Sequence, residues 1–267
     1  MWRWAAGAHA AVASLVEEML HLDLLEEEEG LVWLTLLGRA CGTSSLSFAS
    51  SKRLIRMFKQ GQLRGDTTLG LLTATHVTSE LDDIYTPMQK RGTFETKWSV
   101  LATRNFGADV RRAPQRYAED SWAFHARCKR SLVLRDWMNG KAMADLKNTY
   151  KTNAFIVMDA GSIRGSADAT CFHLRSVHAL ASALLVTGDL DAEAFDREVT
   201  RLKFGLLKKA LGLLELPLRL DRREMLALHA RAGSTLEQLR GWSLTDLQSA
   251  LGEDRGFQVH AVLYSPA

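Results

Sequence analysis

The sequence is poor in cysteine, which argues against both a disulfide-stabilised fold and a cysteine-based metal site. Its three cysteines are Cys41, Cys128 and Cys171. An odd number of widely separated thiols supports neither a disulfide framework nor a CxxC metal site. We therefore expect buried thiols in a cytoplasmic protein.

Long apolar runs and prolines are also scarce. No segment reaches the roughly 18 apolar residues of a membrane helix, and the start, MWRWAAGAHAAVASLVEEML, lacks the apolar core and cleavage site of a secretory signal. With four prolines in 267 residues and long helical periodicities, the chain is predicted to be mainly α.

Nucleotide-binding motifs are absent from the sequence. There is no GxxxxGK[ST] phosphate loop and no Asp-Glu-x-His/Asp motif, and the glycines of Gly161–Gly165 are not followed by lysine. We expect no ATP hydrolysis and no cofactor in this chain, so ATP and Mg²⁺ would belong to a separate motor.

Other catalytic and metal-binding patterns are equally weak. His173 and His178 are five residues apart, which does not fit a helical zinc pair. Asp82, Asp83 and Asp159 are better explained as acidic helix caps. No GxSxG elbow is present. The prediction is therefore no catalytic residue and no metal site.

Charge is nearly balanced overall, at +3, but it is unevenly distributed. Residues 1–30 carry seven acids and one arginine, residues 89–135 carry eleven Lys/Arg against four Asp/Glu, and residues 197–223 carry eight against three. The basic blocks suit a polyanionic partner, although a solvated helix face explains any one of them equally well.

Residues 161–186 are the best candidate for a long central helix. One stripe at helical spacing is apolar and should be buried: Cys171, Leu174, Val177, Ala181, Leu184 and Leu185. A second stripe contains Arg164, Asp168, Phe172 and Arg175. It either binds a nucleic-acid strand, with arginine on phosphate and phenylalanine stacked on a base, or consists of solvated arginines and a core phenylalanine.

Further elements are predicted along the rest of the chain. Helices are expected at 8–22, 45–60, about 115–138 and 191–214, with a β-hairpin at 24–37. Residues 219–252 contain three short helices separated by AGS and GWS, and the tail from residue 256 suggests a strand. Paired short helices with glycine between them occur in helix-hairpin-helix DNA binders and in inert bundles. The candidate nucleic-acid contacts here are Arg222, Arg223 and Gly233.

Several of these segments, taken in order, resemble the C-terminal accessory region of Ski-like superfamily 2 helicases. GLVWLTLLGRACGTSSLSFASSKRLIRM resembles the end of the winged helix, SLVLRDWMNGKAMADLKNTY a helical segment with a Trp–Gly–Tyr pattern, and GSIRGSADATCFHLRSVHALASAL the ratchet helix. The resemblance implies a partial winged helix at 1–44, a ratchet-type helical bundle at 45–214 and a helix-hairpin-helix-like domain at 215–267.

In DNA-repair members of that family, the ratchet helix contacts the translocating single strand through a basic and an aromatic residue. The matching positions here are Arg164 and Phe172. The resemblance implies a module that grips single-stranded or branched DNA or RNA for a helicase motor on another chain. The alternative is a helical protein–protein adaptor that docks through its N-terminal helix and hairpin. A hydrolytic enzyme with an unrecognised site ranks third.

Overall fold

The computed structural model describes residues 2–61, 68–89, 95–106, 118, 120–185 and 191–264. Side chains are not described for residues 2–6, 68, 69, 71 and 74. The chain divides into two compact units. Unit 1 comprises Met1–Ser131 and Ala169–Asp191, and unit 2 comprises Leu132–Asp168 and Ala192–Ala267. Two long helices, α7 (Ser121–Met138) and α9 (Ala160–Leu184), each contribute residues to both units.

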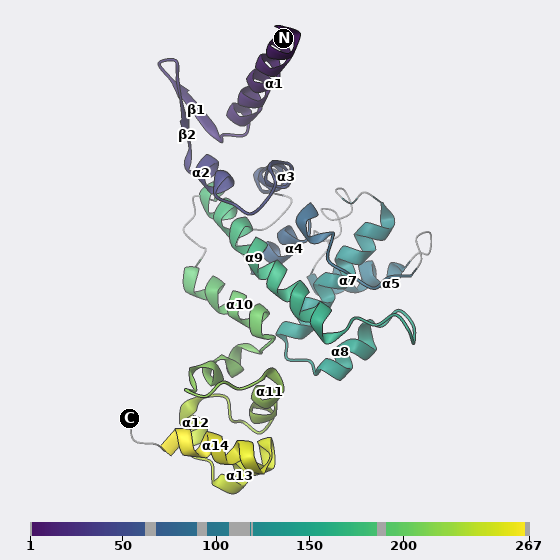
Figure 1. Ribbon diagram of the computed structural model, residues 1–267, viewed down its shortest axis with the longest axis vertical. Coiled ribbons are helices and arrows are strands. Elements are labelled where there is room, and N and C mark those ends of the chain that lie inside the picture. The colour runs from purple at the N-terminus through teal and green to yellow at the C-terminus, as the bar shows by residue number, and fades with distance from the viewer. Residues whose placement is uncertain are drawn as a thin grey trace. The chain divides into compact units, whose positions relative to one another are not determined.

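In the part of unit 1 that the structure describes, the regular elements are helices and one hairpin (Figure 1). Its remaining elements are α1 (Trp2–His21), β1 (Leu25–Glu28), β2 (Leu31–Leu34), α2 (Leu36–Gly42), α3 (Phe48–Lys59), α4 (Thr68–Thr75), the 3₁₀ turn η1 (Ser79–Leu81) and α5 (Thr96–Phe106). The expected helix at 45–60 corresponds to α3, which Ser47 caps by accepting a hydrogen bond from the Ser50 N–H.

The regular elements in the described residues of unit 2 are all helices. Its remaining elements are α8 (Met143–Tyr150), α10 (Ala192–Phe204), the 3₁₀ segment η2 (Lys208–Glu215), α11 (Arg222–Ala230), α12 (Leu236–Arg240), α13 (Leu244–Leu251) and α14 (Glu253–Tyr264). The mainly α prediction is confirmed. Residues 115–117 and 119 of the expected 115–138 helix lie outside the described residues, as does residue 186 of the expected central helix.

The N-terminal hairpin is joined to α2 by a tight corner. Thr35 caps α2 by accepting from the Gly38 N–H at 2.9 Å, and its hydroxyl donates to the Asp23 carbonyl at 2.6 Å. A Cβ on Gly38 would overlap the carbonyl of Leu24. The LTLLGRA segment therefore needs glycine at position 38 and a side-chain oxygen at position 35.

Two predicted elements are wrong. The expected helix at 191–214 ends at Phe204, because Gly205 adopts φ +66° and a Cβ there would overlap Trp137. The expected C-terminal strand is the helix α14, in which Gly256 allows the backbone to approach Gln248.

The apolar stripe of α9 is buried as predicted over most of its length. Cys171, Leu174, Val177 and Ala181 are buried, while Leu184 and Leu185 are half-buried. Cys128 is buried as well, but Cys41 is only half-buried, so the prediction of three buried thiols is wrong for that residue.

Two kinds of feature are missing from the described residues. None of the helices there is long and apolar enough to cross a membrane. Nor do those residues contain a cluster of three histidine, cysteine or acidic side chains that would suit a metal ion.

Helix α11 ends in a left-handed turn made by an alanine. The Gly233 N–H donates to the Leu228 carbonyl and the Ala232 N–H to the His229 carbonyl, both at 3.0 Å. Ala232, not Gly233, has the positive φ of 68°. This double hydrogen bond is the Schellman arrangement, in which glycine normally occupies the left-handed position.

Ala232→Gly should therefore stabilise the protein by roughly 0.5–1 kcal/mol, because the relief of left-handed strain exceeds the extra entropy of the unfolded chain. Urea unfolding measures the change. Ala230→Gly, in the last turn of the same helix, is the matched control and should destabilise by a similar amount. A loss of stability in Ala232→Gly would contradict the assignment of strain to this turn.

Candidate nucleic-acid interface

Unit 2 contains a groove of about 550 Å³ rich in arginine and aromatic residues. It collects side chains from α7, α9, α10, α11 and α14 and from the segment before α11. The lining residues are Trp137, Arg164, Asp168, Lys203, Phe204, Arg219, Leu220, Asp221, Arg222, Glu224, Met225 and Arg255. Two of the residues predicted from the sequence, Arg164 and Arg222, therefore meet in one site.

Arg222 lies at the floor of this groove, and its guanidinium group is held by contacts with other parts of unit 2. Its guanidinium carbon lies 4.0 Å from the ring centroid of Trp137. The same group donates to the carbonyls of Gly205 at 2.7 Å, Lys141 at 2.8 Å and Trp137 at 3.2 Å. Burial, with a smaller effect of the nearby Arg164 charge, lowers the pKa of Arg222 to about 10, so it remains a cation at neutral pH.

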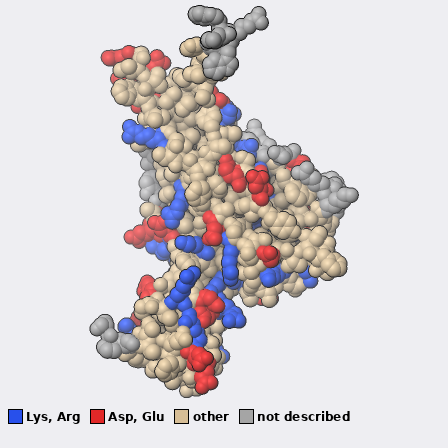
Figure 2. Space-filling model, in the orientation of Figure 1, with Lys and Arg blue, Asp and Glu red and all other residues tan. Residues whose placement is uncertain are grey.

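Three other cations line the groove and are exposed: Arg164, Lys203 and Arg219. No carboxylate among the described residues forms an ion pair with them. Figure 2 shows lysine and arginine side chains gathered around the region of α10 and α11, with acidic side chains among them.

Three carboxylates also line the groove, and two of them are bound to other groove residues. Glu224 pairs with Arg255 at 2.7 Å, and Asp221 caps α11 by accepting from the Glu224 N–H at 2.8 Å. Asp168 is exposed. Because the groove is lined by five cations and three carboxylates, it presents a net positive potential, with Phe204 at its rim, 37% exposed.

The other two members of the predicted stripe belong to the unit 1 part of α9. Phe172 is 62% exposed, so it is not a core side chain, and its ring meets His173 edge-on at 5.2 Å between centroids. Arg175 is also exposed. The ring face and the cation are accessible within unit 1, but neither residue lines the groove.

The remaining predicted contacts have different surroundings. Arg223 is exposed on α11 and does not line the groove. Gly233 is buried, its N–H is used in the end of α11, and a Cβ there would press on Leu239 and Trp242. Close packing therefore explains this glycine.

Sequence reasoning missed three groove residues: Lys203, Phe204 and Arg219. The signal that contained them was the basic block at 197–223. It could not indicate which members face the groove, because the helical pattern continues past Gly205 whereas the helix itself stops.

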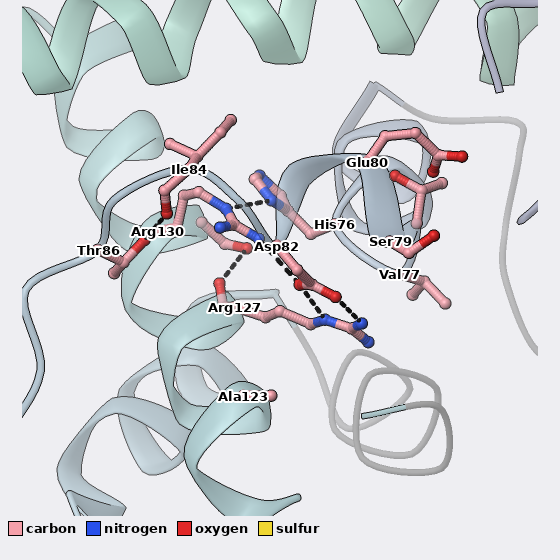
Figure 3. A network of polar contacts seen from close by, with 12 residues as sticks. His76, Val77, Ser79, Glu80, Asp82, Ile84, Thr86, Ala123, Arg127 and Arg130 are labelled. Atoms are coloured by element: carbon pink, nitrogen blue, oxygen red, sulfur yellow. Dashed lines mark hydrogen bonds and ion pairs between the residues drawn. The ribbon is translucent and has the colours of Figure 1, made fainter. Parts of the chain in front are cut away.

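Unit 1 contains a second polar cluster, centred on Asp82 (Figure 3). Arg127 on α7 forms a two-point hydrogen bond to the Asp82 carboxylate at 2.9 and 2.5 Å. Arg130, one turn later and only 1% exposed, donates to His76 Nδ1 at 3.3 Å and lies 3.6 Å from Asp82. Asp82 thus forms ion pairs, and its interpretation as a simple helix cap is wrong.

This cluster holds two buried guanidinium groups on one carboxylate. Burial, together with the Arg130 and Arg127 charges, keeps the pKa of His76 well below its usual value, so this ring is neutral. An adjoining cavity of about 490 Å³ is lined by Arg130 but also by Glu80, Asp82 and Asp83. Because both signs of charge surround it, the cluster is best understood as the link between α7 and the segment after α4.

Asp82→Asn should destabilise the protein by about 2–4 kcal/mol, because Arg127 and Arg130 would keep their charges inside unit 1 without a counterion. Chemical unfolding provides the measurement. Asp83→Asn, at the neighbouring exposed position, is the control and should change stability by less than about 0.5 kcal/mol. Equal effects of the two substitutions would show that the buried arginines do not depend on Asp82.

No protein-family model matches this sequence, and no curated protein is similar enough to count as a match. Function therefore has to be inferred from the side chains of the chain itself.

Proposed function

We propose that this protein binds single-stranded nucleic acid through the basic groove of unit 2. The observation that supports this most directly is the set of three exposed cations, Arg164, Lys203 and Arg219, around one aromatic-rimmed groove. Phosphates bind such cations with release of counterions, while a base stacks on an exposed ring. Arg222 holds the floor in place and adds to the potential.

The biological role that we propose is that of an accessory nucleic-acid-binding region serving a helicase motor in the cytoplasm. Support comes from the order of segments that resemble Ski-like helicases and from the position of Arg164 on α9. The sequence contains no phosphate loop, so ATP and Mg²⁺ would be bound by a separate motor chain. Phe172 and Arg175, exposed in unit 1, are proposed as further contacts along the strand.

The proposal predicts that Arg164→Ala, Lys203→Ala and Arg219→Ala each weaken binding of a fluorescent single-stranded oligonucleotide. Each lost phosphate contact should also make the slope of log affinity against log salt shallower by about 0.7. Anisotropy titrations at several salt concentrations measure both quantities.

The matched control is Arg197→Ala on α10, an exposed cation outside the groove that pairs with Glu193 at 3.4 Å. It should bind like the unmodified protein. The proposal fails if the groove variants and this control have the same affinity and the same salt slope.

A second candidate function is protein docking, and the N-terminal hairpin favours it. All four residues of β2 are exposed, including Trp33 at 55%, and so are Val12 and Leu15 on α1. Neighbouring exposed apolar side chains of this kind mark protein interaction surfaces.

The docking function predicts that Trp33→Lys removes concentration-dependent association, or binding to a motor chain, without lowering the unfolding temperature. Sedimentation velocity over a range of concentrations tests this. Glu27→Lys, on the opposite strand, is the control for added positive charge. Unchanged association in Trp33→Lys would argue against the hairpin as a docking surface.

A further inference from the structure

An apolar slot adjoins the basic groove, and the two share residues. The slot has a volume of about 490 Å³. Its residues in common with the groove are Lys203, Phe204, Arg219, Leu220 and Met225, and its remaining lining is Leu213, Leu214, Leu216 and Leu218. A ligand in the groove therefore has direct access to the slot.

We propose that this slot receives an unpaired base of the bound strand. The inference rests on the proposed function and specifies how the strand is held: phosphates on the cations and one base among the leucines. Among the residues that the structure describes, the slot is lined by six aliphatic side chains and one phenylalanine, and the charged residues among them are the two cations that it shares with the groove.

The residues that line the slot differ in how deeply they are buried. Leu213, Leu216 and Leu220 are buried and form a fixed floor, whereas Leu214 and Leu218 are half-buried. Phe204, 37% exposed, lies at the boundary with the groove, and the Lys203 ammonium lies 5.6 Å from its ring centroid. A base that enters loses apolar contact with water and gains stacking, which no phosphate contact supplies.

Charge complementarity selects a nucleic acid over other apolar occupants. The slot opens beside Lys203 and Arg219, both exposed cations, and the adjoining groove adds Arg164. A polyanion places a phosphate on each side of every base, so it satisfies cations and slot together. An apolar peptide would leave the cations without counterions.

Side-chain chemistry also predicts what the slot does not do. Of the described residues that line the slot, only the lysine and the arginine have polar side chains, so none of these residues offers an amide, hydroxyl or carboxylate to read the edge of a base. The slot should therefore require that a base be present and show little preference among the four bases.

The test compares a ten-nucleotide single strand of thymidines with a strand of the same length whose sugars carry no bases. Both have the same phosphates. The unmodified protein should bind the abasic strand about 5- to 150-fold more weakly. A ten-nucleotide strand of adenosines should bind within about threefold of the thymidine strand.

Two variants test whether the difference in affinity between the thymidine and abasic strands arises in the slot. Leu218→Trp fills the slot, and Phe204→Ala removes the ring at its rim, where a half-exposed side chain tolerates truncation. In each variant the difference between the thymidine and abasic strands should shrink to less than about threefold. Arg164→Ala is the control: it should weaken both strands by the same factor. Circular dichroism and unfolding titrations establish that each variant is folded.

The outcomes separate the two proposals. If the unmodified protein binds both strands equally, or both slot variants keep the full difference, the base-slot inference is overturned while the groove proposal stands. If neither strand binds, the proposed function itself fails. If oleate displaces the bound strand while the thymidine and abasic strands bind with equal affinity, the slot would be assigned to an acyl chain. That outcome would likewise overturn the inference.

Discussion

The arrangement of unit 2 depends on one arginine stacked on one tryptophan. Arg222 lies against Trp137 and donates to carbonyls at the end of α7, in the loop that follows it and just past the end of α10. Carbonyls at helix ends have no partner within their own helix. A single planar cation therefore binds three carbonyls from two stretches of chain, and its cation–π contact with Trp137 contributes about 1–2 kcal/mol. Trp137 completes the arrangement by donating from Nε1 to the Leu202 carbonyl at 2.7 Å.

The cations of the groove are of two kinds, those held by contacts within the protein and those exposed to solvent. Arg222 is held by Trp137 and by backbone carbonyls, and it adds to the positive electrostatic potential of the groove. Lys203 and Arg219, in contrast, are exposed and accessible to a ligand. Unit 1 uses buried charge differently. There, Asp82 holds Arg127 and Arg130 inside the fold, and the acidic residues of the adjoining cavity offset the arginines. The same residue types thus produce a ligand-accessible surface in one unit and an internal link in the other.

Apolar periodicity and capping residues in the sequence predicted those helices whose bounds depend on neighbouring residues. The apolar stripe of α9 follows from the helical period, and the short helices α12 and α13 begin at Thr235 and Ser243, whose hydroxyls accept from their own first turns. The break at Gly205 was not predictable in this way. Glycine inside a helix costs only about 1 kcal/mol, and here the decision comes from Trp137 and Arg222, which are distant in sequence.

The candidate site shows the same limit. Arg164 stood out because it recurs with other residues along one helix face, but nothing in the spacing indicated that it would meet Arg222. Lys203 and Arg219 belong to the basic block at 197–223, in which most of the other members do not line the groove. For Asp82, the partner on α7 is 45 residues away, so a local cap was the only interpretation available from the sequence.

The two edges of the hairpin differ in how readily they would pair with a further strand. Glu26, Glu27 and Glu28 occupy β1, while Leu31 to Leu34 occupy β2. A strand edge lined with carboxylates repels its own copy, because pairing would place like charges opposite one another. The β2 edge has no such protection. Any strand that extends this small sheet, whether from a binding partner or during aggregation, should therefore add at β2, which makes growth of the sheet one-sided.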